Sequence, residues 1–337
     1  MPRQSKIMIE LEKEKKEITT KFFVLLGLIV LVTVIGIFLL FKASEVPTVG
    51  VKKRGKDLES FLPIILREGI AIINVEGVIQ FGSSRSLFGI REYGASVIVS
   101  RIKKYSEIDK VKGIVLRINS PGGTIGAVQE IYRELIKFRA KGKIVVASMG
   151  DIAASGGYYI ASAADEIVAN PGTITGSIGV IIAAPSFVNL FNKIGISYRV
   201  FKSGKYKDIL SPYREISSEE KALIQSVVDD AYEQFFNAVK IGRNLPERKL
   251  KRYADGRIFT GRQAKKLGFV DELGGLQDAI KLAGKLTGLG ENPYIIKERV
   301  SPWQQFFGLL HQEKKTLTEK LFNTTYNSVP VYYLYQP

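Results

Sequence analysis

Apolar runs of strand length alternate with amphipathic segments of helical length through the middle of the chain. The apolar runs predict strands at Ile70–Val75, Ile114–Ile118, Ile144–Ser148, Glu166–Ala169 and Tyr198–Lys202. The amphipathic segments predict helices near Ala95–Tyr105, Thr124–Arg139, Ser155–Ala164 and Ser186–Lys193. Such alternation is typical of parallel βαβ units with helices packed outside the strands. The pattern therefore predicts an α/β fold built on a parallel sheet.

A long helix is predicted next, from Ser218 to about Ile241. The run Ser217-Ser218-Glu219-Glu220 opens it and resembles a capping box. Short helices are expected over Arg248–Leu286, separated by Asp255-Gly256 and Gly274-Gly275. This later segment is predicted to belong to the same domain as the alternating region.

An apolar run precedes the domain and has the length of a membrane helix. Phe22–Phe41 comprises 20 residues without charge, and a helix of that length spans about 30 Å, the thickness of a bilayer core. A cleaved signal peptide would have a shorter apolar region and a small-residue cleavage site, so a retained anchor is predicted. Lys and Arg number six in residues 1–21 and five in residues 42–61, so charge alone hardly orients the helix.

These patterns divide the chain into five parts. A charged segment at 1–21 is followed by the transmembrane helix at 22–41 and a linker at 42–64. The folded domain is predicted at 65–290. The tail at 291–337 is apolar enough to pack on this domain or on another subunit.

Composition excludes several kinds of chemistry. The chain has no cysteine and a single histidine, His311, which excludes disulfides, thiol nucleophiles, cysteine zinc sites and histidine-rich metal centres. We therefore expect neither a metal nor a cofactor. The net charge of +16 comes without the interleaved aromatic residues of a nucleic-acid platform. Attraction to anionic lipid is the favoured use of this charge, and no nucleic-acid partner is expected.

Ser155 is a candidate nucleophile because its neighbours are small. Ala153-Ala154 precede it and Gly156-Gly157 follow it, which would admit a substrate backbone and leave a bare N–H nearby. The alternative is a tight turn that caps a helix. In the near absence of histidine, a lysine would have to take the serine proton. Lys202, Lys205 and Lys207 are available, and the sequence does not choose among them.

Three glycine-rich junctions follow consecutive predicted strands. They are Asn119–Thr124, the Ser155 junction and Asn170–Gly179. The carboxyl edge of a parallel sheet is where ligands bind. The N–H groups of Gly122-Gly123 and of Gly156 would lie at helix starts, where they lack helical partners and could form an oxyanion hole.

The run Ala147–Tyr159, followed by Ala164-Asp165-Glu166-Ile167 and Gly176-Ser177-Ile178-Gly179, resembles the signal peptide peptidase A family over about residues 65–290. That family consists of membrane-anchored Ser/Lys endopeptidases with the Clp-protease/crotonase-like fold, a ββα superhelix with parallel sheets. The resemblance implies a short form with one peptidase domain, which assembles into a homo-oligomeric ring.

The resemblance also implies roles for individual residues. Ser155 would be the nucleophile, Lys207 the general base and Ser177 the residue that orients the lysine. The oxyanion hole would come from Gly122 or Gly123 together with Gly156.

The expected function is a membrane-tethered serine endopeptidase that degrades apolar peptides, such as signal peptides left in the bilayer. The anchor would cross the cell membrane once, with the catalytic domain on the extracytoplasmic side. Two alternatives stay open at this point. One is a non-catalytic membrane scaffold or peptide-binding protein of the same fold, and the other is a crotonase-type acyl-CoA enzyme.

Overall fold

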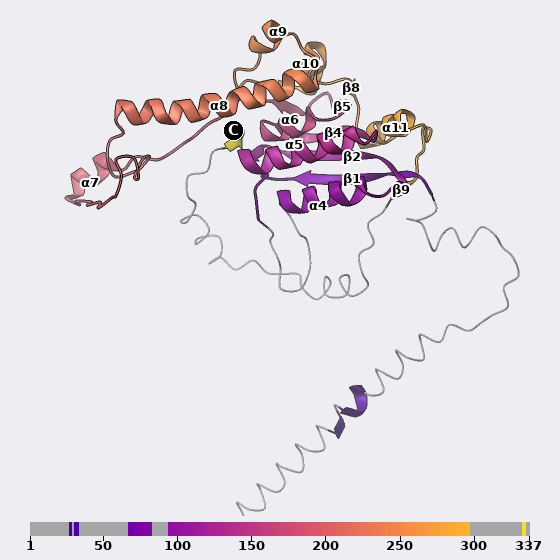
Figure 1. The fold of residues 1–337 in the computed structure, drawn as a ribbon, viewed down its shortest axis with the longest axis horizontal. Helices are drawn as coiled ribbons and strands as arrows, with labels where there is room; N and C mark the ends of the chain where they lie inside the picture. The colour runs from indigo at the N-terminus through magenta and orange to yellow at the C-terminus, as the bar shows by residue number, and fades with distance from the viewer. Residues whose placement is uncertain (1–26, 29, 34–66, 83–93, 297–331, 335–337) are drawn as a thin grey trace, which may run out of the picture. The chain divides into compact units, whose positions relative to one another are not determined.

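The computed structural model describes residues 27–28, 30–33, 67–82, 94–296 and 332–334 (Figure 1). The chain divides into two compact units, Met1–Ser60 and Phe61–Pro337, of which the second carries the sheet. The predicted segments 1–21 and 42–64 lie outside the described residues, as does most of the predicted tail 291–337. Residues 27–28 and 30–33 of the predicted span 22–41 are helical. Within the described residues, no helix combines the length and the apolar character needed to cross a membrane.

Eight strands of the described residues form one sheet. They are β1 (Gly69–Glu76), β2 (Val111–Ser120), β4 (Ile144–Ala154), β5 (Glu166–Ala169), β6 (Ile174–Gly176), β7 (Ile258–Thr260), β8 (Glu272–Leu273) and β9 (Ile295–Ile296). The order is β7-β6-β4-β2-β1-β9, with β5 beside β4 and β8 beside β5. The pairs are parallel except β6 with β7. The predicted α/β fold with a mostly parallel sheet is confirmed.

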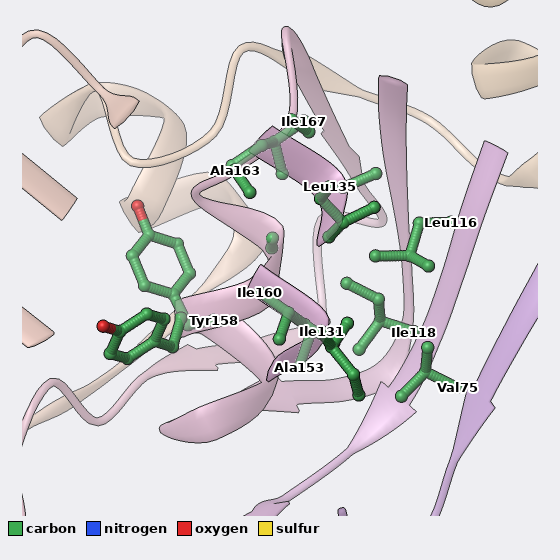
Figure 2. Packing of buried hydrophobic residues seen from close by; sticks show 14 of the residues in the cluster. Val75, Leu116, Ile118, Ile131, Leu135, Ala153, Tyr158, Ile160, Ala163 and Ile167 are labelled. Atoms are coloured by element: carbon green, nitrogen blue, oxygen red, sulfur yellow. The ribbon is translucent and has the colours of Figure 1, made fainter. Parts of the chain in front are cut away.

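Helices cover both faces of the sheet because side chains alternate along its strands. Ile114, Leu116 and Ile118 of β2 belong to the cluster that includes α4 (Ala95–Ser106), α5 (Ile125–Ala140) and α6 (Gly156–Ala161). Val115, between them in sequence, packs in a second cluster with α11 (Leu276–Leu286). Figure 2 shows Leu116 and Ile118 beside Ile131 of α5. Continuous apolar runs in the sequence reflect this burial on both faces.

The remaining elements extend from this layered core. They are α7 (Val188–Ile194), α8 (Ser218–Gly242), α9 (Glu247–Lys251), α10 (Gly261–Leu267), β3 (Gly122–Thr124) and β10 (Tyr332–Leu334). The predicted capping box of α8 is confirmed. The Glu220 N–H donates to Ser217 Oγ at 3.2 Å, and the Ser217 N–H donates to Glu220 Oε2 at 3.0 Å. Helix α8 packs on α6 through the stacked rings of Tyr159 and Phe235, 4.8 Å apart.

Two predicted elements differ in the structure. The strand at Tyr198–Lys202 is wrong, because this segment is irregular and pairs with no strand among the described residues. Its apolar side chains stay exposed, Phe201 at 96%. No burial of apolar surface therefore stabilises a strand here. The helix expected at Ser155–Ala164 is shorter, Gly156–Ala161, because β4 continues through Ala154 and Ser155 forms the turn.

Candidate active site

Ser155 forms a sharp turn between a buried strand and a helix. Strand β4 ends at Ala154, helix α6 begins at Gly156, and Ser155 between them has φ 52° and ψ −118°. A residue with a Cβ rarely adopts such backbone angles, and they recur where a nucleophile is presented at a strand-to-helix turn. The turn is held by the Ser155 N–H, which donates to the Gly176 carbonyl at 2.9 Å. Ser155 is only 1% exposed.

The predicted oxyanion glycines meet at this turn. A Cβ added to Gly156 would lie 3.1 Å from the Gly123 nitrogen and 2.7 Å from Val128 Cγ2, so only glycine fits there. Because Gly156 is the first residue of α6, its N–H has no acceptor within the helix. Tertiary structure thus brings the 122–123 turn directly against the residue that follows Ser155.

The structure separates the two glycine candidates of the first junction. The Gly122 N–H already donates to Ser120 Oγ at 3.1 Å. The Gly122 carbonyl and the Thr124 N–H both bond to Ile79 at 2.8 Å, so the N–H of Gly123 faces the opposite edge of β3. Strand β10 pairs antiparallel with β3 at that edge, with Tyr333 opposite Gly123. The Gly123 N–H thus lies at the edge along which β10 runs, and it is the candidate donor for a substrate group that takes the place of β10.

Ser177 lies at the corresponding end of the neighbouring strand. The last residues of β4 and β6, Ala154 and Gly176, are paired. Ser155 and Ser177 directly follow them in the chain. Ser177 also has a positive φ of 51°, and its N–H donates to the Arg257 carbonyl at 2.8 Å. It is 8% exposed. The two serines thus share one edge of the sheet, each at a strained position.

Lys207 lies in a region of a different kind. No residue from 181 to 219 is buried, and Lys207 itself is exposed. Its N–H donates to the Gly204 carbonyl at 3.2 Å within a short series of turns. Among the described residues, no hydrogen bond joins Lys207 to Ser155. The structure brings Ser155, Ser177 and the glycines together and leaves Lys207 outside that group.

The three candidate lysines differ in their partners. Lys202 Nζ donates to Asp208 Oδ1 at 2.5 Å, and Lys205 Nζ pairs with Glu219. Hydrogen bonding to Glu219 raises the pKa of Lys205, which opposes the neutral form that a base requires. Lys207 Nζ has no carboxylate partner among the described residues. This distinction is not visible in the sequence.

The chain is similar to known proteases over most of its described length. Residues 137–290 match the profile of peptidase family S49, and residues 86–173 match that of Clp protease. A Synechocystis protein named "Putative protease slr0021" is 47% identical over 223 residues, which cover 66% of this chain and 76% of that protein. The chain belongs to peptidase family S49. The protein is therefore a serine protease.

Two further relatives carry more specific names. "Putative signal peptide peptidase SppA" of Enterococcus faecium is 37% identical over 254 residues, 73% of this chain and 74% of that protein. "Serine protease SPPA, chloroplastic" of Arabidopsis thaliana is 38% identical over 229 residues, 68% of this chain and 33% of the longer plant protease. The resemblance to the signal peptide peptidase A family is thereby confirmed. The two alternative functions, a non-catalytic scaffold of the same fold and a crotonase-type acyl-CoA enzyme, are therefore not adopted.

Sequence reasoning missed one feature of this protease. Arg214 and Asp208 form an ion cluster with Glu220 close to Lys207, whereas the sequence singled out Glu220 only as part of a helix cap. Charged residues spaced along an irregular segment gave no periodic signal that could have identified the cluster.

Proposed function

We propose that this serine protease is a membrane-tethered Ser/Lys endopeptidase that degrades apolar peptides, such as cleaved signal peptides. Ser155 is the nucleophile, Lys207 the general base and Ser177 the residue that orients the lysine. Gly123 and Gly156 supply the oxyanion hole. The observation that carries the proposal is the strained turn of Ser155, held with Gly156 against Gly123.

Each of these residues has a step in the reaction. As Ser155 Oγ attacks the peptide carbonyl carbon, neutral Lys207 takes its proton. The N–H groups of Gly123 and Gly156 donate to the oxygen that becomes negative. The lysine ammonium then protonates the departing amine, which leaves an acyl-enzyme. Water attacks that ester, with Lys207 again accepting the proton, and Ser155 is regenerated.

In this proposal, Lys207 reaches Ser155 of a neighbouring copy when the chains form an oligomer. The segment before it exposes apolar side chains from one end to the other: Ile181, Phe187, Leu190, Ile194, Ile196, Tyr198, Val200 and Phe201. Exposed apolar surface of this extent is typical of an interaction site. A second copy of the chain is the proposed cover, in a head-to-tail contact that closes into a ring. The neighbour's nucleophile and this Lys207 would then form one site.

The edge of β3 supports a peptide as substrate. Its antiparallel pairing with β10 demonstrates that an extended segment fits along Gly122–Thr124, and β-strand addition is a common mode of peptide binding. Small residues, Ala153 and Ala154, form the adjacent end of β4, where both are buried. Tethering by the run Phe22–Phe41 in the cell membrane, with the domain on the extracytoplasmic side, would hold the site near peptides released in the bilayer.

Cleavage of a quenched apolar peptide by the full-length protein tests the proposal. Ser155→Ala and Lys207→Ala should each lower kcat by at least about 10³-fold, since each removes a group that acts on the reacting atoms. Lys205→Ala is the matched control, because Lys205 occupies the same turn but pairs with Glu219. Full activity in both Ser155→Ala and Lys207→Ala would reject the proposed dyad. Protease protection of the domain in sealed cells tests the topology.

A further inference from the structure

Arg214 is the centre of an ion cluster that includes Asp208, the residue after Lys207. Its Nε and Nη2 donate to Asp208 Oδ2 and Oδ1, each at 2.8 Å. Its Nη1 donates to Glu220 Oε2 at 2.9 Å and its Nη2 to Glu220 Oε1 at 2.5 Å. One guanidinium thus bridges two carboxylates in fork geometry, which a lysine cannot reproduce.

The cluster joins the irregular segment to a regular helix. Glu220 lies in the first turn of α8 and is 4% exposed, the first buried residue after position 180. Its carboxylate also closes the capping box with Ser217. Hydrogen bonds from Arg214 and from the Ser217 backbone lower the pKa of Glu220 to about 2, so it is ionised at neutral pH. Glu220 is therefore a fixed point from which the preceding turns can be held.

Asp208 carries the connection to Lys207, its neighbour in sequence. Besides the fork from Arg214, its side chain accepts Lys202 Nζ at 2.5 Å, and its carbonyl accepts Arg214 Nη2 at 3.2 Å. Both the side chain and the backbone of Asp208 are thereby fixed. In a segment without buried residues, these bonds act together with the rings of Phe191 and Tyr198, which pack on Tyr213, to set the position of the backbone.

We propose that Arg214 is a positioning residue of this protease, which holds the Lys207 turn on α8 by bridging Asp208 and Glu220. The inference rests on the proposed function, in which Lys207 is the base. In this role Arg214 makes no contact with the substrate. Its effect is to keep Lys207 Nζ within reach of the serine proton, since a base displaced by about 1 Å can lose on the order of 10²-fold in rate.

Peptide cleavage by full-length Arg214→Gln, Arg214→Lys and Asp208→Asn tests the role. We expect kcat to fall about 10- to 100-fold while KM changes less than about threefold, because a misplaced base slows the chemical step and leaves peptide binding intact. Arg214→Lys should recover little, since it restores the charge without the fork. Asp208→Asn keeps the measurement possible should an Arg214 variant fail to fold.

Arg139→Gln is the matched control. Arg139 donates from Nε to Asp165 Oδ1 at 2.7 Å, and its side chain is 32% exposed, the same as that of Arg214. Its pair ties α5 to the chain before β5, away from Lys207. Arg139→Gln should lower the melting temperature and leave kcat unchanged.

Lys207→Ala distinguishes failure of this inference from failure of the proposed function. Full activity in Lys207→Ala would reject the base itself. If Lys207→Ala is inactive but the Arg214 and Asp208 variants lose no more kcat than Arg139→Gln, the positioning role alone is overturned. It is also overturned if activity falls only in proportion to the loss of assembled protein in sedimentation, or if KM rises while kcat stays constant.

Discussion

The nucleophile and the proposed base of this protease lie in regions that are built in opposite ways. From Gly122 to Ser177 the chain contributes β3, β4, β5 and β6 with α5 and α6, and most of its side chains are buried. From 181 to 217 it contributes one short helix, α7 (Figure 1), and none of these residues is buried. The first region is fixed by a core, and the second by rings packed around Tyr213 and by an ion cluster at its end.

Catalysis requires a nucleophile held at a fixed turn and a base whose long side chain can reach it, and the two regions differ in which of these they can supply. The positive φ of Ser155 costs conformational energy, and it persists because β4, β6 and α6 determine the backbone on both sides. The segment from 181 to 217 has no buried residue that could determine its backbone in this way, and Leu210 there has a φ of 64° within a series of turns. This segment can instead present a long side chain to a second copy, provided that charged pairs fix the turn that carries it.

Mixing two inactive variants should produce the largest effect. If Ser155 and Lys207 act across an interface, 1:1 mixed assemblies of Ser155→Ala and Lys207→Ala contain intact sites at about a quarter of the interfaces. Peptide cleavage should therefore rise from background to about a quarter of the wild-type rate. Assembly after dissociation provides the mixture, and each variant alone is the control. No recovery in mixed assemblies of verified composition would place the dyad within one chain.

Glycine substitutions should separate the two regions by stability. A Cβ at Gly123 would lie 1.8 Å from the Ile79 carbonyl oxygen, whereas a Cβ at Gly204 would meet nothing within 4 Å. Gly123→Ala should therefore lower the free energy of unfolding by about 3 kcal/mol. Gly204→Ala should change it by less than about 0.5 kcal/mol. Urea unfolding measures both, and equal effects would contradict the contrast between the regions.

Removal of β10 should have a smaller effect, a change in kcat/KM for peptide cleavage at the nucleophile region. Strand β10 occupies the edge of β3 that the proposed peptide uses, so the two compete for Gly122–Thr124. Deleting residues 331–337 should raise kcat/KM about threefold, because the competent edge is then populated more often. A deletion that leaves kcat/KM unchanged would mean that β10 does not compete with substrate.

Acid should remove the stabilisation that ionised Glu220 gives to the end of the second region. Because its pKa in the folded protein is about 2, below the ordinary value of 4.5, the ionised group stabilises the fold above pH 4.5. That contribution is lost as pH falls through about 2. The difference in urea midpoint between wild type and Glu220→Gln should be constant at higher pH and shrink between about pH 4.5 and 2. A difference that does not change with pH would contradict this assignment.

The sequence was sufficient for the first region because local rules agree with the fold there. The runs Val145–Ala147 and Ile167–Ala169 are apolar and buried on both faces of the sheet, as buried parallel strands require. The same reasoning failed at Tyr198–Lys202, where an apolar run of strand length has no neighbouring strand among the described residues. Periodicity measures the apolar character of a segment and cannot tell whether its own chain or another molecule covers it.

The sequence by itself determined the alternation of strands and helices and the capping box of α8, and it singled out Ser155 and the junction glycines as candidates, whereas Ser177 was implied by the family resemblance. These depend on contacts between near neighbours or on residue types that a motif requires. Tertiary structure decided which N–H of the 122–123 turn is already bonded, that Gly156 lies against Gly123, and that Lys207 stands apart on a segment held by Arg214. Those outcomes depend on hydrogen bonds and packing between residues distant in sequence or placed by irregular backbone, for which no local pattern exists.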